Sequence, residues 1–462
     1  MGHRSHTSPT VWVHYILRRL HIPPHYFLVF LAMLVGWLTA WAAYIFQVSI
    51  YWLQEMVLRS LANHWAIVFV PVLGGLICGQ IVRFSAKEAR GQGIAEVMYA
   101  VLMRGGIIPM RVAISKIFAT VATLGSMGAA GQEGPIVQIG SALGSGIGQW
   151  FRLSSSTLKI LVGCGAAAGI SATFQAPIGG VLFALEVILG TFSPNTFTPI
   201  IIASVIASVT FQSIGTTHSM LNLHVESPGI SMEMIGFVST GLFCGLVSVF
   251  MIRSLCASER WFQRIRISEW VKPALGGLVI GILMLMWPLI GGSGERMMAA
   301  LATGEIFPAH WLLALLLIKL VAICATLGSG GSGGVFFPSL VIGAVSGLFC
   351  HSLFSIWFSL SSPSLYMLIG MAAVVSGTTH GPIAAIIVLC ELSGHFSLIL
   401  PLMAASISSV IVARALLEVS IYGIKLKERG IHLKDGHDLD ILRTYKVGDL
   451  MESNIPRVNG DT

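Results

Sequence analysis

The 462-residue chain is 55% hydrophobic and only 10% charged, whereas a soluble domain carries about 25% charged residues. This composition excludes a soluble globular protein, and the lack of period-two alternation excludes a transmembrane β-barrel. The net charge of +7 is concentrated beside apolar runs, which indicates membrane topology signals and argues against a nucleic-acid partner. The seven cysteines form no CxxC pair and lie mostly in apolar runs, so we expect neither disulfides nor a metal site.

Apolar runs fill most of the chain from residue 26 to residue 418. They include residues 26–53, 63–82, 231–252, 276–291 and 310–327. Helical runs of this kind can cross a hydrocarbon core of about 30 Å at about 1.5 Å per residue. The first run is too long for the core of a cleavable signal peptide. We therefore predict an all-α polytopic protein that is embedded in the lipid bilayer.

Basic residues mark one side of the predicted membrane. They cluster near the N-terminus, between residues 253 and 272, and near the C-terminus, whereas residues 190–230 contain no lysine or arginine. The positive-inside rule then places both termini and the 253–272 loop in the cytoplasm and the 213–229 loop outside. The short loops favour a bacterial inner membrane.

The chain contains an internal repeat. When Pro135 is placed over Pro338, "LGSMGAAGQEGPIVQIG" (124–140) aligns with "LGSGGSGGVFFPSLVIG" (327–343). A second match follows in the same order, between "FQAPIGGVLFALE" (174–186) and "THGPIAAIIVLCE" (379–391). Two collinear matches are hard to attribute to chance and predict two related halves.

The two halves have opposite orientations, because each crosses the membrane an odd number of times. The predicted organisation is a cytoplasmic segment (1–25), a first membrane repeat (26–212), an extracytoplasmic linker (213–229), a second membrane repeat (230–426) and a cytoplasmic tail (427–462). Inverted repeats of short, tilted and glycine-broken helices are typical of transport proteins, which bind their substrate where the repeats meet.

The glycine motifs predict an anion site made of backbone. "GQEGP" (131–135) and "GGVFFP" (333–338) each read as a loop that enters a helix. Free N–H groups at helix N-termini attract anions, and glycine allows close approach. Glu133 is the one charged residue of the first motif, and it aligns with Phe336 in the repeat. We expect its carboxylate to occupy the site itself and to be displaced or protonated when an anion passes.

These motifs resemble those of the CLC chloride channels and proton-coupled chloride transporters over roughly residues 26–426. "GQGIAE" (91–96) is similar to the family's GSGIPE, "GQEGP" to GREGP and "GGVFFP" to GxFxP, and Tyr422 matches the pore tyrosine. The tail at 445–462 resembles the beginning of a CBS domain and ends before such a domain could fold.

The resemblance implies an all-α homodimer with a chloride pore in each subunit and no cofactor or enzymatic activity. Glu133 would be the external gating glutamate. The resemblance further implies an anion pathway lined by Gln92, Gly93, Gln132, Gly134, Val335, Phe336, Phe337 and Tyr422, with the backbone amides and the tyrosine hydroxyl as donors.

Three positions depart from the family pattern. Gln92 replaces a serine that contacts the central anion, Ala95 replaces a helix-starting proline, and Val187 replaces the glutamate that exchangers use for internal proton transfer. Because valine carries no proton, we expect passive, channel-like or weakly proton-coupled transport of chloride. A chloride/proton antiporter is the alternative, and a fluoride exporter ranks below it.

Four other charged residues stand at matched positions in the two halves. Lys116 aligns with Lys319, and we expect the pair either to raise the local potential for anions or to pack or snorkel. Glu186 aligns with Glu391, and helix geometry turns Glu186 about 100° away from Val187. We expect both carboxylates to pack or form salt bridges.

An intramembrane serine hydrolase is the lowest-ranked alternative. "GGSGG" (330–334) formally matches G-x-S-x-G, with Ser332 as nucleophile and His380 as a distant base. That motif needs a strand–turn–helix context, which an all-helical bundle lacks.

Overall fold

The protein is described here from a computed structural model covering residues 24–60, 64–215, 233–302, 307–356 and 361–431, with residues 433–434 and 438–439. Within these ranges, eight helices are long and apolar enough to span a membrane. The two short strands β1 (Leu433–Lys434) and β2 (Asp438–Leu439) pair antiparallel near the C-terminal end of the described chain. The predicted all-α polytopic fold is therefore confirmed.

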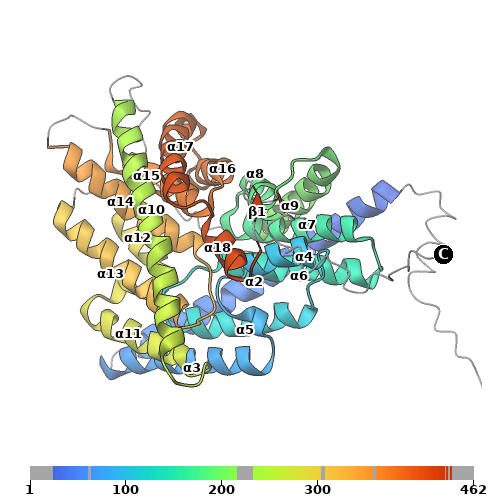
Figure 1. The fold of residues 1–462 in the computed structure, drawn as a ribbon, viewed down its shortest axis with the longest axis horizontal. Helices are drawn as coiled ribbons and strands as arrows, with labels where there is room; N and C mark the ends of the chain where they lie inside the picture. The colour runs from blue at the N-terminus through green and yellow to red at the C-terminus, as the bar shows by residue number, and fades with distance from the viewer. Residues whose placement is uncertain are drawn as a thin grey trace, which may run out of the picture.

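The first half forms one group of helices, coloured blue to green in Figure 1. Its elements are α2 (Pro24–Ser60), α3 (His64–Phe84), η1 (Lys87–Ala89), α4 (Ile94–Met103), α5 (Met110–Gly125), α6 (Glu133–Trp150), α7 (Ser155–Phe174), α8 (Pro177–Phe183), the π-helical turn η2 (Ala184–Leu189) and α9 (Pro194–Ile214).

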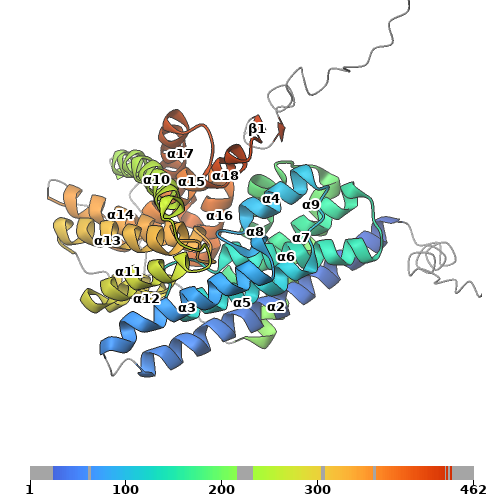
Figure 2. The same cartoon turned by 60° about the horizontal axis from the view of Figure 1, so that its bottom comes forward.

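The second half lies beside the first in both views, coloured from yellow-green to red (Figure 2). Its elements are α10 (Glu233–Arg264), α11 (Lys272–Met286), η3 (Pro288–Ile290), α12 (Glu295–Leu301), α13 (Ala309–Gly328), α14 (Phe336–Phe354), α15 (Pro363–Thr379), α16 (Pro382–Ser393), η4 (Phe396–Leu398) and α17 (Ile399–Leu416). The last helix, α18 (Ile421–Glu428), follows these elements.

The same helix pairs pack in both halves. Helix α6 packs on α7 as α14 packs on α15, and α2 packs on α9 as α10 packs on α17. Across the boundary between the halves, α3 packs on α11 and α8 packs on α16. An element that packs against its own counterpart is the mark of a two-fold relation. The structure therefore consists of two inverted repeats.

Glycines set the close helix contacts, and they do so symmetrically. A Cβ on Gly140 would lie 2.2 Å from the carbonyl oxygen of Gly165, and one on Gly343 would lie 2.4 Å from that of Gly370. At the boundary, a Cβ on Gly277 would lie 2.1 Å from the Pro71 carbonyl oxygen. Small residues let helix backbones approach closely where lipid supplies no hydrophobic drive for association. These glycines are therefore part of the scaffold.

The predicted domain boundaries stay predictions. Most of the 1–25 segment, of the 213–229 linker and of the tail beyond residue 431 lies outside the described residues. The proposed start of a CBS domain at 445–462 also lies outside them.

Candidate anion pathway

Three glycine loops meet at the centre of the molecule. The amide of Gly131 donates to the carbonyl of Gly334 at 2.8 Å, and the amide of Gly334 donates back at 2.6 Å. The amide of Gly333 donates to the carbonyl of Gly91 at 3.2 Å. Since α4, α6 and α14 begin just after these loops, the bonds bring three helix N-termini together.

The loops can meet because glycines stand at their points of contact. A Cβ on Gly134 would lie 2.2 Å from the carbonyl oxygen of Gln92 and 2.9 Å from the Cα of Gly334. Gly93 has a φ of 86°, a conformation that strains any other residue. The predicted site residues Gln92, Gly93 and Gly134 are therefore neighbours.

The Glu133 carboxylate lies at the N-terminus of the other repeat's helix. Glu133 is the first residue of α6 and is fully buried. Its Oε2 accepts a hydrogen bond from the amide of Phe337, at 3.4 Å, in the first turn of α14. Within the described chain its Oε1 has no hydrogen-bond partner. An acidic group thus occupies a position at which helix α14 attracts negative charge.

Two more polar side chains are buried at the site without partners. The Tyr422 hydroxyl and both amide atoms of Gln92 have no hydrogen-bond partner among the described residues. Leaving a buried polar atom unpaired costs about 1–3 kcal/mol, so these groups are available to bind an anion or water. Helix α18 holds Tyr422 in place, because its N-cap Ser420 accepts a hydrogen bond from the amide of Gly423 at 3.2 Å.

The remaining predicted lining residues are also buried at this centre. Val335, Phe336, Phe337 and Gln132 are each at most 2% exposed. The Phe336 ring packs on Phe174, with ring centroids 5.4 Å apart. The Phe336 side chain therefore packs in the apolar core, so its backbone is the part of this residue that could contact an anion.

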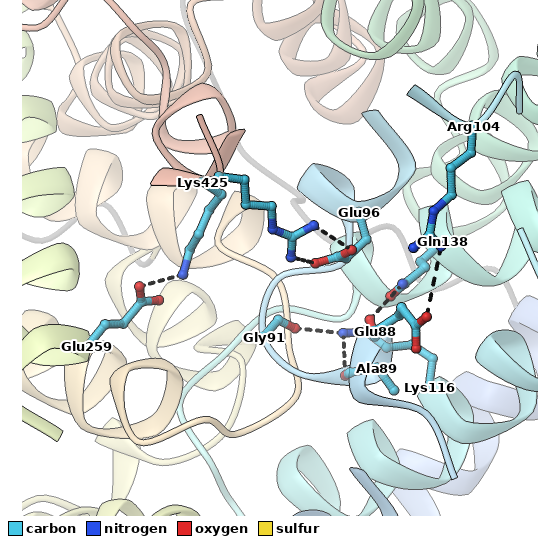
Figure 3. A network of polar contacts seen from close by, with 10 residues as sticks. Glu88, Ala89, Gly91, Glu96, Arg104, Lys116, Gln138, Glu259 and Lys425 are labelled. Carbon is cyan, nitrogen blue, oxygen red and sulfur yellow. Dashed lines mark hydrogen bonds and ion pairs between the residues drawn. The ribbon is translucent and has the colours of Figure 1, made fainter. Parts of the chain in front are cut away.

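The two buried lysines bind loop carbonyls. Lys116 Nζ donates to Ala89 at 3.1 Å and to Gly91 at 2.6 Å, as Figure 3 shows. Lys319 Nζ does the same in the second repeat, to Ile290 at 2.9 Å and Gly292 at 3.2 Å. Neither side chain snorkels to the surface, and each holds a loop. Their effect on the potential at the anion site stays a prediction.

A cavity of about 160 Å³ opens beside Gln92. Salt bridges border it, and they join α18 to both repeats: Arg429 pairs with Glu96 of α4 through both carboxylate oxygens, and Lys425 pairs with Glu259 of α10 (Figure 3). These roles do not follow from the sequence, in which the C-terminal cations are read only as topology signals. The cavity gives the Gln92 side of the site a polar entrance.

The structure places Val187 and Glu186 on the π-helical turn η2, with Val187 buried. The Glu186 carboxylate accepts from the amides of Ile383 at 3.2 Å and Ala384 at 2.7 Å, in the first turn of α16. Glu391 accepts from the first turn of α8 in the same way, at 3.0 and 2.7 Å. Among the described residues neither carboxylate forms a salt bridge, and both lie where α8 and α16 pack on each other. Each binds the free amides of the opposite helix.

Ser332 is held by hydrogen bonds to neighbouring residues of η1 and α5. Its hydroxyl donates to the Ala89 carbonyl at 3.0 Å and shares a hydrogen bond with Thr120 at 2.9 Å. Neither of these partners is a base, and the surrounding elements are helices and loops. The geometry therefore gives no support to the hydrolase alternative.

The fold and this site are those of a membrane transport protein built on two inverted repeats. The chain belongs to the voltage-gated chloride channel family, whose model matches residues 74–414. It is 30% identical over 407 residues to the voltage-gated ClC-type chloride channel ClcB of Escherichia coli, covering 85% of this chain and 97% of that protein.

Solved structures share the fold. One is a slow cyanobacterial Cl⁻/H⁺ antiporter, with a TM-score of 0.77 and 24% identity over 87% of this chain and 97% of that chain. Another is a CLC-type fluoride/proton antiporter, with a TM-score of 0.75 and 23% identity over 86% of this chain and 96% of that chain. At this identity the likeness establishes the architecture alone.

Proposed function

We propose that this protein transports chloride across the membrane and that Glu133 gates the pathway. The observation that carries the proposal is the position of the Glu133 carboxylate. It lies at the N-terminus of α14, close to where the loops of both repeats are bonded together. Family membership supports the same conclusion, as does the name of the Escherichia coli relative, a chloride channel.

The mechanism uses competition between two anions for one set of amides. The carboxylate of Glu133 acts as a tethered anion that accepts from the Phe337 amide. Protonation or displacement of the carboxylate leaves the amides of the α14 first turn to chloride. The Tyr422 hydroxyl and the Gln92 amide supply further donors. Because the site is made of partial charges, it binds an anion without holding it as tightly as a full positive charge would.

Val187 favours an uncoupled or weakly proton-coupled pathway. A valine cannot take up a proton, and the neighbouring Glu186 is held by two backbone amides of α16. The alternative is chloride/proton antiport, which the name of the cyanobacterial structure brings into consideration. Fluoride export is the lesser alternative, brought into consideration in the same way by the fluoride/proton antiporter.

We further propose a homodimer in a bacterial inner membrane, with both termini in the cytoplasm. The exposed isoleucines Ile178 and Ile383 occupy matched positions in the first turns of α8 and α16. These two helices pack on each other, and the two isoleucines are apolar groups on them that could contact a second copy. The position of the basic clusters supports the orientation.

Flux from proteoliposomes with simultaneous pH recording tests the proposal. We expect chloride efflux with little or no proton movement, and slower efflux of fluoride. The Glu133→Gln variant should keep chloride flux and lose most of its dependence on external pH, since the amide cannot titrate. Absence of chloride flux in the wild type would contradict the proposed function. Stoichiometric, chloride-driven proton uptake would replace the uncoupled mechanism with antiport.

A further inference from the structure

The loop before α12 is the counterpart of the loop before α4. Gly91–Gly93 and Gly292–Gly294 share the pattern glycine–polar–glycine. Each loop ends on a glycine with positive φ, 86° at Gly93 and 107° at Gly294. Each also has carbonyls bound by a buried lysine. Because the repeats are inverted, these two loops border the anion site from opposite sides of the membrane.

The residue after the loop differs between the repeats. Ile94, at the start of α4, is fully buried, whereas its counterpart Glu295 is a half-buried acid. The Glu295 carboxylate accepts from the Tyr51 hydroxyl at 2.7 Å and from Gln132 Nε2 at 3.5 Å. At this position the second repeat therefore contributes a carboxylate, whereas the first repeat has an apolar residue.

Glu295 stands between the surface and the gate. Tyr51 is 38% exposed, whereas Gln132 is 2% exposed and the adjacent Glu133 is fully buried. The hydrogen bonds therefore lead from an accessible phenol, through Glu295, to the residue next to the gate. Because Gln132 contacts Glu295 and directly precedes Glu133 in the chain, the two acidic residues are neighbours at the outer end of the site.

Resting on the proposed function, we propose that Glu295 is the second carboxylate of the outer gate. It is a positioning residue whose negative charge sets the external pH at which Glu133 leaves the pathway. A nearby negative charge favours the protonated, neutral form of a carboxyl group. When Glu295 is ionised, Glu133 takes up its proton at a higher external pH than it would without Glu295. Chloride flux is therefore activated at that higher pH.

The other titratable and charged groups around Glu295 come from four elements. They are Tyr51 of α2, Glu133 of α6, Arg296 of α12 and Lys319 of α13. Lys319 is bound to carbonyls of the loop, and Tyr51 donates to Glu295. Of these four groups, Glu133 is the only carboxyl group, so it is the one whose protonation the negative charge of Glu295 favours.

The test is chloride flux against external pH in reconstituted Glu295→Gln. We expect the pH of half-activation to fall by about one pH unit, because a nearby like charge then no longer disfavours the ionised form of Glu133. Tyr51→Phe should move it in the same direction by less, because the carboxylate of Glu295 loses a donor. In a Glu133→Gln background, Glu295→Gln should produce no such shift.

Glu55→Gln is the matched control. Glu55 lies one turn beyond Tyr51 on α2, is 63% exposed and pairs with Arg59, so its loss should leave the pH of half-activation unchanged. The inference is overturned if folded Glu295→Gln keeps the wild-type midpoint, if Glu55→Gln shifts it equally, or if the shift persists without Glu133. Absence of chloride flux in the wild type would instead contradict the proposed function.

Discussion

The two repeats share a scaffold and differ at the pathway. In each, a glycine pair sets the contact between two long helices, and a buried lysine binds the carbonyls of a loop. In each, a carboxylate binds the first turn of a helix in the opposite half. These features serve packing and the satisfaction of buried polar groups, which both halves need equally.

The differences gather at the anion site. Glu133 begins α6 where Phe336 begins α14, and Ile94 begins α4 where Glu295 begins α12. Symmetry thus supplies backbone amides from both halves, whereas Glu133 and Glu295 are acids whose counterparts in the other repeat are apolar. This division implies that scaffold variants should have equal effects in the two repeats and that pathway variants should not.

Replacing the matched glycines should have the largest effect on stability. A Cβ at Gly140 or at Gly343 would lie within 2.4 Å of a backbone oxygen of the next helix, and such overpacking costs about 1–3 kcal/mol or more. We expect Gly140→Ala and Gly343→Ala to lower the unfolding midpoint in detergent by similar amounts. Gly423→Ala is the control, since its nearest neighbour would be a side-chain atom at 3.3 Å. A loss confined to one repeat would contradict the shared scaffold.

The reciprocal carboxylates should have a smaller and again equal effect. Glu186→Ala and Glu391→Ala each free two amides at the start of a helix, and the loss of such a cap costs about 1 kcal/mol. The glutamine variants keep one acceptor oxygen and should cost less. Thermal unfolding in detergent measures both. If Glu186→Gln abolished proton coupling while Glu391→Gln did not, Glu186 would have a transport role beyond its cap.

The repeat and the helix starts could be predicted from the sequence because identical residues recur at a fixed offset. The alignment that places Lys116 on Lys319 also places the glycine loop before α6 on the glycine loop before α14. The further match of Gly91–Gly93 with Gly292–Gly294 was missed, because it is shifted by two residues relative to the alignment on Pro135 and Pro338. Glu295 was overlooked with it.

Other parts of the site depend on contacts that no local pattern encodes. Arg429 and Glu96 are 333 residues apart in the chain, and only the folded arrangement shows that they border the cavity beside Gln92. The caps at Glu186 and Glu391 were missed for the same reason, since each binds a helix about 200 residues away. The fold was thus more predictable than the contacts that complete its site.

The location of a bound halide tests the central claim most directly. Anomalous diffraction from crystals soaked in bromide would place the ion in the wild type and in Glu133→Gln. The account predicts bromide at the first turn of α14, near the Tyr422 hydroxyl, and additional bromide in the variant where the Glu133 carboxylate lies in the wild type. Bromide found away from these helix N-termini, or an unchanged pattern in Glu133→Gln, would contradict it.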